Sequence, residues 1–517
     1  MTNVAISFTS DERTYGGLPA QFLKNRFFER NPTQAQGAAM LARPGTSALE
    51  TYGEGPIRAN FSQPGLFNGA LFTVSGNTLF RRDTDGTVIV VGGVVAGTGE
   101  VSMDGVSGAD FEHLFLADGA TLQLYNGPDG LGVHALTSVP VPDGLPPCGV
   151  ATLKGHVLIA ISYSDRFYWI KPGEVTIDGL DFATAESQPD DTVAVKVVGD
   201  TAFFIGEGST EVWFPTGDLD TPFAPVNGRV FDHGGVSGTA VSIKGTVFLV
   251  GVDGIVYAVR GGSERISNHG IEQTIRSVLA VSGGVLQRSW TFDFDGHVFY
   301  VLDLDFEGSL VYDLLTGQWS RFVTEGFGGR WNLRNGFHWR SGRMVVGGGS
   351  KGDLLRLDPS LFTDIGINPG TSFLFLEGAG FSDGDLLLLE GADFSPPEAL
   401  LIDGEGSPVE YEVRGILKTA GTNFLRQYSL RMIGSSGVLG DDVSPTMVMQ
   451  FSDDRGETWS SEYTIALTQN TKQRIEFRSL GAFAAPGRIF RIRDTGGVQF
   501  LSSVEASIGG VDDGPPA

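Results

Sequence analysis

Only one cysteine occurs in this chain of 517 residues, so no disulfide can form within it. That residue, Cys148, lies in a proline-rich turn, and its isolation favours synthesis in a reducing compartment. The chain has no stretch of about 18 consecutive apolar residues, and its N-terminus has neither a basic start nor an apolar core. We therefore expect no membrane-spanning segment and no Sec-dependent export.

Basic residues are scarce as well: 36 lysines and arginines stand against 61 aspartates and glutamates, which gives a net charge of −25. A protein that binds nucleic acid by neutralising phosphates needs clustered basic side chains. A chain this acidic would repel DNA instead. A plainer reading is that the acidity keeps a large β protein soluble.

The motifs of catalytic and metal sites are missing. The seven histidines show neither His-x-His nor His-Glu-x-x-His spacing, and His156 and His297 each follow a turn glycine, which favours packing beside the turn. There is no Gly-x-Ser-x-Gly elbow, phosphate-binding loop or calcium loop. Carboxylates are too numerous for a catalytic pair to be singled out. The sequence thus predicts no catalytic residue, no metal site and no cofactor.

Glycine, in contrast, is abundant: the chain has 74 glycines, about twice their average share of roughly 7%. Seven of them precede a short apolar strand, at steps of 39, 47, 44, 46, 51 and 46 residues. A second turn and strand follow each time, and Asp-Gly or Asn-Gly turns supply the positive φ angles that hairpins need. Paired strands at a period of about 40 to 50 residues are typical of β-propeller blades. The seven are Gly69, Gly108, Gly155, Gly199, Gly245, Gly296 and Gly342.

Composition and pattern divide the chain into four parts, all of them β or irregular. Residues 1–60 are punctuated by prolines and indicate an extended arm, in which only 34–41 could form a turn or two of helix. Residues 61–360 carry the repeats and predict a six- or seven-bladed β-propeller. Residues 361–410, with ten acidic and no basic residues, form an acidic insert, and 411–510 predict a C-terminal β-sandwich or barrel module. Part of the arm is expected to close the propeller by pairing with its last blade.

Two local patterns add detail. Residues 271–279 place apolar side chains at i, i+4, i+7 and i+8, which predicts one short surface helix between two hairpins. Residues 488–493 mix basic and apolar residues in near alternation, which predicts a strand with one buried face and a row of three arginines on the other.

The sharpest local motif runs from Ser452 to Trp459 and resembles the Asp-box of sialidases and related propeller proteins. In such a hairpin turn Asp454 accepts backbone N–H groups, Gly456 takes the strained backbone angle and Trp459 packs beneath. The boxes of sialidases lie away from the active site and recur, whereas one full copy occurs here. We interpret Ser452, Asp454, Gly456, Thr458 and Trp459 as a structural turn.

Several segments together resemble the tail hub proteins of short-tailed bacteriophages, the nozzle family also called packaged-DNA stabilisation proteins. The most specific match is AESQPD, which leads into a strand and then EVWF. The helix pattern and the order of the C-terminal strands are also similar, whereas the acidic insert departs from the family. The matching segments are NRFFERNP (25–32), RPG (43–45), GEVSM (99–103), AESQPD (185–190) and EVWF (211–214).

The resemblance implies a structural virion protein without enzymatic activity. Such proteins assemble as a ring, expected here to be a hexamer, below the portal and adaptor proteins. They continue and close the DNA channel, retain packaged genome, and anchor tail fibre, spike or needle proteins. The protein would be assembled in the host bacterial cytoplasm and lie in the virion tail, where genomic DNA passes without specific binding. We expect part of the acidic excess, including Asp383 and Asp385, to face the channel.

Two other functions stay open. The Asp-box motivates a glycan-active, sialidase-like propeller enzyme, which would need a cleft with an arginine cluster facing a pair of carboxylates. A propeller centre filled by its blades would argue against that enzyme. A receptor-binding tail adhesin would instead hold its ligand at an exposed loop face.

Overall fold

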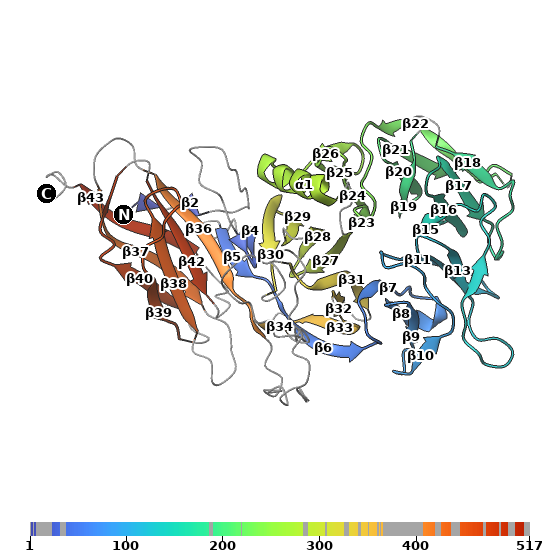
Figure 1. Cartoon of the computed structure of the whole chain (residues 1–517), viewed down its shortest axis with the longest axis horizontal. Coiled ribbons are helices and arrows are strands. Elements are labelled where there is room, and N and C mark those ends of the chain that lie inside the picture. The colour runs from blue at the N-terminus through green and yellow to red at the C-terminus, as the bar shows by residue number, and fades with distance from the viewer. Residues whose placement is uncertain are drawn as a thin grey trace, which may run out of the picture.

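The computed structural model shows a β-propeller and a smaller β module side by side along the longest axis (Figure 1). The all-β prediction is confirmed, and the one α-helix among the described residues is α1 (His269–Ser282), on the outside of the propeller. The structure describes residues 2–3, 5–6, 23–30, 38–185, 190–218, 220–282, 288–304, 308–324, 330–339, 343–349, 351–358, 361, 363–364, 407–418, 425–435, 445–468, 472–484, 487–494 and 502–510.

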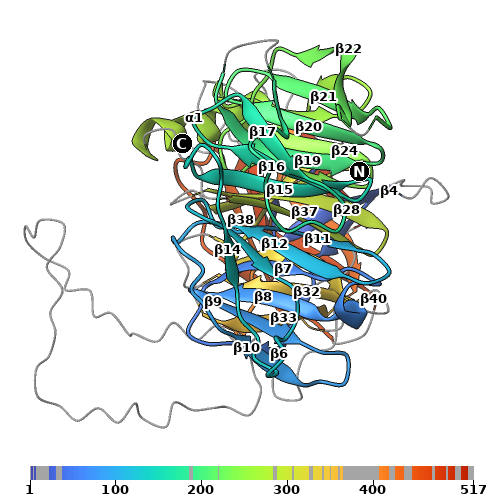
Figure 2. The same ribbon diagram turned by 90° about the vertical axis from the view of Figure 1, so that its right-hand side faces the viewer.

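The propeller consists of seven four-stranded antiparallel sheets, so the six or seven blades expected are seven. Figure 2 shows these blades from the side, with their strands running across the view. In chain order the blades are β7 (Ile57–Phe61), β8 (Leu71–Ser75), β9 (Thr78–Arg82), β10 (Val88–Val91); β11 (Ser102–Ser107), β12 (Glu112–Ala117), β13 (Leu122–Tyr125), β14 (Thr137–Val139); β15 (Pro147–Leu153), β16 (His156–Ile161), β17 (Arg166–Ile170), β18 (Phe182–Thr184); β19 (Thr192–Val198), β20 (Thr201–Gly206), β21 (Thr210–Pro215), β22 (Phe223–Phe231); β23 (Val241–Ile243), β24 (Thr246–Val250), β25 (Val256–Val259), β26 (Ser263–Arg265); β27 (Arg288–Phe294), β28 (His297–Leu304), β29 (Gly308–Asp313), β30 (Gln318–Phe322); and β31 (Leu333–Trp339), β32 (Arg343–Gly348), β33 (Asp353–Asp358) with β6 (Gly45–Thr51).

In six of the seven blades the repeated glycine lies just before the second strand or in the turn that precedes it, whereas Gly342 lies outside the described residues. Gly155, Gly199, Gly245 and Gly296 precede β16, β20, β24 and β28, and their φ angles lie between 60° and 84°. A Cβ atom disfavours this backbone region, so glycine is the residue that suits the turn. The second strand has a partner on each side, and every residue of β8 and β24 is buried. This position explains the continuous apolar run after each glycine.

A strand of the N-terminal arm closes the ring. β6 pairs antiparallel with β33, with Ala48 opposite Leu355 and Gly45 opposite Asp358. The seventh blade is thus completed from the other end of the repeat region, as the sequence led us to expect. The closure covers a sheet edge that would otherwise be open to other strands.

The C-terminal module is a β-sandwich. One sheet has the order β1-β43-β37-β40, with β41 beside β37, and the other runs β3-β36-β42-β38-β39, with β2 beside β36. The apolar core between them includes Leu430, Met432, Met447, Phe490 and Ile492. The strands are β1 (Thr2–Asn3), β2 (Ala5–Ile6), β3 (Leu23–Lys24), β36 (Tyr411–Lys418), β37 (Leu425–Ser435), β38 (Thr446–Ser452), β39 (Tyr463–Ala466), β40 (Lys472–Arg478), β41 (Ala482–Phe483), β42 (Gly487–Asp494) and β43 (Ser502–Gly510).

The N-terminal segment takes part in both units. β1 pairs with β43 and β2 with β36, so the segment contributes a strand to each sheet of the sandwich. β3 then lies between β36 and β30, and a single ten-stranded sheet runs from the sixth blade into the sandwich. β4 (Arg26–Arg30) and β5 (Ala38–Ala42) follow as a hairpin.

Two sequence-based expectations are wrong. Residues 38–41 form β5 instead of a helical turn, because β4 supplies their backbone partners and Met40 enters the sandwich core; residues 34–37 lie outside the described residues. Along β42, Arg491 and Arg493 face outward, but Arg488 lies on the same face as Phe490 and is 1% exposed. The alternation breaks at the adjacent apolar residues 489 and 490, and that break turns Arg488 inward.

Candidate functional site

The propeller and the sandwich meet at a buried polar network on the N-terminal arm. Asn25 Oδ1 accepts a hydrogen bond from the backbone N–H of Val323 (2.7 Å), just after the sixth blade. Its amide donates to the carbonyl of Glu410 (2.7 Å), just before the sandwich strand β36. Asn25 has φ 57°, a left-handed conformation that asparagine tolerates better than most residues. One side chain thus joins the ends of two units.

Arg43 extends this network from a fully buried position. Its guanidinium donates to both carboxylate oxygens of Asp364 (2.6 and 2.9 Å) and to Asn25 Oδ1 (2.9 Å). Further bonds reach the carbonyls of Pro44 (3.0 Å) and Val323 (2.8 Å). A planar guanidinium matches a carboxylate in this two-point manner, which makes the pair both strong and directional.

A second buried ion pair joins Arg26 of β4 to Asp494 at the end of β42. The two side chains are 0% and 1% exposed, and the Arg26 guanidinium lies 5.1 Å from the centroid of the Tyr411 ring. Removing one partner of such a pair leaves an uncompensated buried charge, which is strongly destabilising. Both pairs therefore resist separation of the arm from its neighbours.

His297 binds the β4–β5 hairpin to the sixth blade. Its Nδ1 lies 2.8 Å from Asp313 Oδ2, and its Nε2 lies 2.7 Å from Glu29 Oε2. Burial alone lowers the pKa of His297, but the hydrogen bonds to the two carboxylates outweigh it and raise the pKa. Packing beside a turn, the role expected for His297, describes only part of its environment, because no local pattern indicates that Glu29 lies opposite.

The Asp-box-like run forms the turn between β38 and β39. Ser452 Oγ accepts the backbone N–H of Gly456 (2.8 Å) and donates to Asp454 Oδ1 (2.6 Å). Asp454 also accepts the backbone N–H of Thr458 (2.9 Å) and its hydroxyl. These hydrogen bonds hold the pKa of Asp454 well below its usual range. The φ angles are 69° at Arg455 and 96° at Gly456. Both carboxylate oxygens are used inside the turn.

Trp459 follows this turn and contacts two arginines of the neighbouring strands. The guanidinium groups of Arg414 and Arg491 lie 5.8 and 5.7 Å from centroids of its ring system. Both arginines also donate to Glu412, at 2.9 and 3.1 Å, and this carboxylate separates two like charges directly opposite each other on β36 and β42. The motif thus stabilises the outward face of the sandwich.

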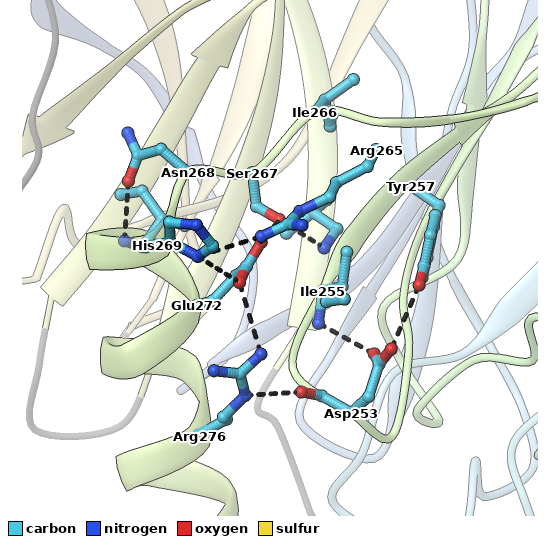
Figure 3. Close-up of polar contacts among 12 residues, drawn as sticks. Asp253, Ile255, Tyr257, Arg265, Ile266, Ser267, Asn268, His269, Glu272 and Arg276 are labelled. Atoms are coloured by element: carbon cyan, nitrogen blue, oxygen red, sulfur yellow. Dashed lines mark hydrogen bonds and ion pairs between the residues drawn. The ribbon is translucent and has the colours of Figure 1, made fainter.

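Glu272, in the first turn of α1, is the centre of a polar cluster that joins the helix to the fifth blade (Figure 3). Its buried carboxylate lies 2.6 Å from Arg265 and 3.3 Å from Arg276, and it accepts the hydroxyl of Ser267 (2.9 Å). Arg276 also donates to the carbonyl of Asp253 in the β24–β25 turn (2.7 Å). The arginines are about half exposed, so the cluster anchors the helix at the surface, with one carboxylate shared by two arginines.

The helix expected from the sequence is confirmed. Asn268 caps it by accepting the backbone N–H of Ile271 (2.9 Å). Ile271, Ile275 and Val278 pack into a core shared by the fifth and sixth blades.

A cavity of about 320 Å³ lies on the propeller axis, where the inner strands of all seven blades meet. Its charged lining residues are Glu100, Asp104 and Lys196. Burial raises the pKa of Glu100 to about 7 and lowers that of Lys196, although each partly offsets the other. The propeller centre is therefore hollow, and no residue of the Ser452–Trp459 turn lines it.

The other expected sites are less informative. Asp383 and Asp385 lie outside the described residues. Burial raises the pKa of Cys148 to about 12, which keeps its thiol protonated. Across the described ranges, no group of three or more His, Cys, Asp or Glu side chains is placed to hold a metal ion. In the same part of the chain, no helix has the length and apolar character needed to cross a membrane.

These polar networks hold arm, propeller and sandwich together, which defines a protein of the propeller-and-sandwich type closed by its N-terminal arm. A family model described as "Bacteriophage P22 Gp10, beta-propeller" matches residues 11–361, and one described as "Bacteriophage P22 Gp10, beta-sandwich" matches 406–508. The chain belongs to the Gp10 family of bacteriophage P22. It is a structural protein of the tail of short-tailed phages, of the tail hub or packaged-DNA stabilisation kind, and the resemblance seen in the sequence is confirmed.

Similar solved structures include the extracellular domain of the hybrid two-component system BT4673 from B. thetaiotaomicron, with 11% identity and a TM-score of 0.40. It is matched over 62% of this chain, which spans 40% of that domain. U3-55K matches with 13% identity over 61% of this chain and 99% of its own, with a TM-score of 0.39. These scores are too low to carry an argument. Among curated proteins, none matches the sequence.

Proposed function

We propose that this protein is a subunit of the tail hub, or nozzle, of a short-tailed phage. It forms a ring, expected to be a hexamer, below the portal and adaptor proteins. The ring continues and closes the DNA channel, retains the packaged genome and anchors fibre, spike or needle proteins. The observation that carries this proposal is the match to both Gp10 domains, in order, over most of the chain.

The junction between propeller and sandwich supports a role as a rigid ring subunit. A sheet that runs from the sixth blade into the sandwich, with the pairs Arg43–Asp364 and Arg26–Asp494 beside it, holds the two units at a defined angle. A ring closes only if every subunit presents its two contact surfaces at the same rotation, so a subunit with a fixed internal angle suits this assembly.

The charge supports passage of DNA without capture. With a net charge of −25, the chain offers little of the clustered positive charge that holds phosphates. DNA in a channel of this composition is repelled from the wall and slides. The placement of Asp383 and Asp385 on that wall stays a prediction.

Immunogold electron microscopy of purified virions tests the proposal. Label at the single tail vertex, between capsid and fibres, is the expected result. Label at the tips of fibres or spikes would favour the adhesin instead, and particles without label would refute a virion role. Assembly in the host cytoplasm predicts unlabelled empty capsids and a soluble pool of subunits in infected cells.

A glycan-active enzyme is the second candidate, because the propeller axis is hollow and brings Arg288 and Arg334 within electrostatic range of Glu100 and Asp303. Incubation of the purified protein with a fluorogenic sialoside and with host surface polysaccharide tests it. We expect no release of sugar, and sugar release that disappears in Glu100→Gln would overturn the structural assignment.

A further inference from the structure

Five charged residues act on one another beside the axial cavity, and two of them, Glu100 and Lys196, line it. Arg288 and Asp303 face each other on β27 and β28 of the sixth blade, and Arg334 stands on β31 of the seventh. Glu100 and Lys196 come from the second and fourth blades. All three cations act on the Glu100 carboxyl and lower its pKa, which burial raises. The five groups therefore share one electrostatic environment.

The three cations of this group lack partners. Within the described part of the chain, the side chains of Arg288, Arg334 and Lys196 make no hydrogen bond or ion pair. Arg288 is only 7% exposed, so water cannot fully replace a partner. Burial, followed by repulsion from Arg288, lowers the pKa of Arg334 to about 9. A buried guanidinium beside a half-buried one of like charge is costly unless an anion joins them.

Arg58 shows what a satisfied arginine looks like near the same axis. It is equally buried, and its guanidinium donates to the carbonyls of Gly76, Val95, Ala96 and Gly99 at 2.6 to 3.2 Å. The fold therefore can supply acceptors to an arginine here, and it does not supply them to Arg288 or Arg334.

The cavity wall carries further unpaired donors. The indole Nε1 of Trp290, a residue 3% exposed, and the amide Nδ2 of Asn335 have no partner in the described structure, and both residues line the cavity. Arg288 and Arg334 directly precede the lining residues Ser289 and Asn335 in the chain. One buried acceptor on the same wall, Glu100 Oε1, also has no partner in the described structure.

We propose that this part of the propeller axis binds a small oxyanion, a phosphate or a carboxylate, through Arg288, Arg334 and Lys196. Two guanidinium forks and an ammonium group are the side chains that recognise such oxygens. Glu100 opposes binding when ionised, so it sets an upper limit on affinity. The cavity of about 320 Å³ leaves room for an organic part attached to the anion.

Calorimetric titration and thermal unfolding of the full chain test this proposal, with inorganic phosphate and acetate as probes and sodium chloride keeping the ionic strength constant. We expect saturable binding of at least one probe and a rise in melting temperature. Arg334→Gln should lower affinity tenfold or more, and Glu100→Gln should raise it severalfold. Arg166→Gln, at an exposed arginine outside the cavity, is the matched control and should bind as the unmodified chain does.

The same variants without added anion separate a binding role from a structural one. Arg334→Gln should melt at or above the temperature of the unmodified chain, because it removes a half-buried charge that Arg288 repels. No saturable binding by the unmodified chain would overturn the proposal, as would equal binding by Arg334→Gln and Arg166→Gln. If Arg334→Gln fails to fold, an unchanged affinity in Glu100→Gln would overturn it too. Phosphate preferred over acetate would indicate a phosphate ester, and the reverse order a carboxylate.

Discussion

Replacing Arg43 by methionine should destabilise the buried junction between propeller and sandwich. The change keeps most of the side-chain volume but removes five hydrogen bonds, two of them to Asp364. The Asp364 carboxylate is 3% exposed, so it would lose its cation where water cannot replace it. Loss of one partner of a buried ion pair costs about 3–5 kcal/mol, and we expect the free energy of unfolding to fall by that amount.

The assay must distinguish the unfolding of the propeller from that of the sandwich, since a chain with both units need not unfold in one step. Differential scanning calorimetry separates the transitions, and limited proteolysis reports whether the connection between the units opens first. The double variant Arg43→Met with Asp364→Leu is the matched control. It removes both charges, and we expect it to recover most of the loss, because apolar residues of similar volume often replace a buried pair without cost.

A loss below about 1 kcal/mol for Arg43→Met would refute this reasoning, because it would place the pair among solvent-exposed salt bridges. A double variant as unstable as Arg43→Met would also refute it, since the cost would then come from packing and from the lost hydrogen bonds to Asn25, Pro44 and Val323, and not from the unpaired carboxylate.

Three further predictions concern the contact of His297 with the β4–β5 hairpin, the sandwich turn at Asp454 and the Glu272 cluster that holds α1. His297→Gln should lower the free energy of unfolding by roughly 2 kcal/mol at a pH where the histidine is charged. Folding raises the pKa of His297, so this contribution to stability is fully present below about pH 6.5 and is lost as the pH rises through the folded-state pKa. Chemical unfolding across pH should therefore show the free energies of unfolding of the variant and the unmodified chain converging in alkaline buffer. A difference that stays constant with pH would contradict this role of His297. Asp454→Ala should lower the melting temperature of the sandwich alone, whereas Glu457→Ala, in the same turn, should change little by calorimetry. Glu272→Gln should cost about 1–3 kcal/mol and expose α1 to hydrogen exchange; unchanged protection would show that apolar packing alone holds the helix.

The propeller could be predicted from sequence because its signals are local. Each glycine such as Gly155 sits in a turn that needs positive φ, and the strand after it is apolar because it has neighbours on both sides. Ring closure by β6 could be predicted because the last blade of a propeller would otherwise leave an exposed sheet edge. The helix α1 was visible because its periodicity is contained in one short segment.

What could not be predicted depends on pairing between distant segments. Nothing near Glu29 indicates that it meets His297, and nothing near Arg288 indicates that it lies within electrostatic range of Glu100. The inward position of Arg488 depends on Asp453, which binds its guanidinium at 2.7 Å through both oxygens, so a charge in the core is compensated by a residue from another strand. A single sequence shows which residue types are present, but it does not show which distant residues come into contact.

The pairing of the first strands has a consequence for synthesis. Thr2 pairs with Ala506 and Ala5 with Ile416, so this segment is synthesised long before the strands with which it pairs. Neither sandwich sheet can be completed before β36 and β43 have been made, and such long-range pairing is slow to form. Until then the sandwich strands keep unpaired edges, which are prone to aggregate. Truncated products should therefore be removed or precipitate, and only full-length subunits would be available for assembly.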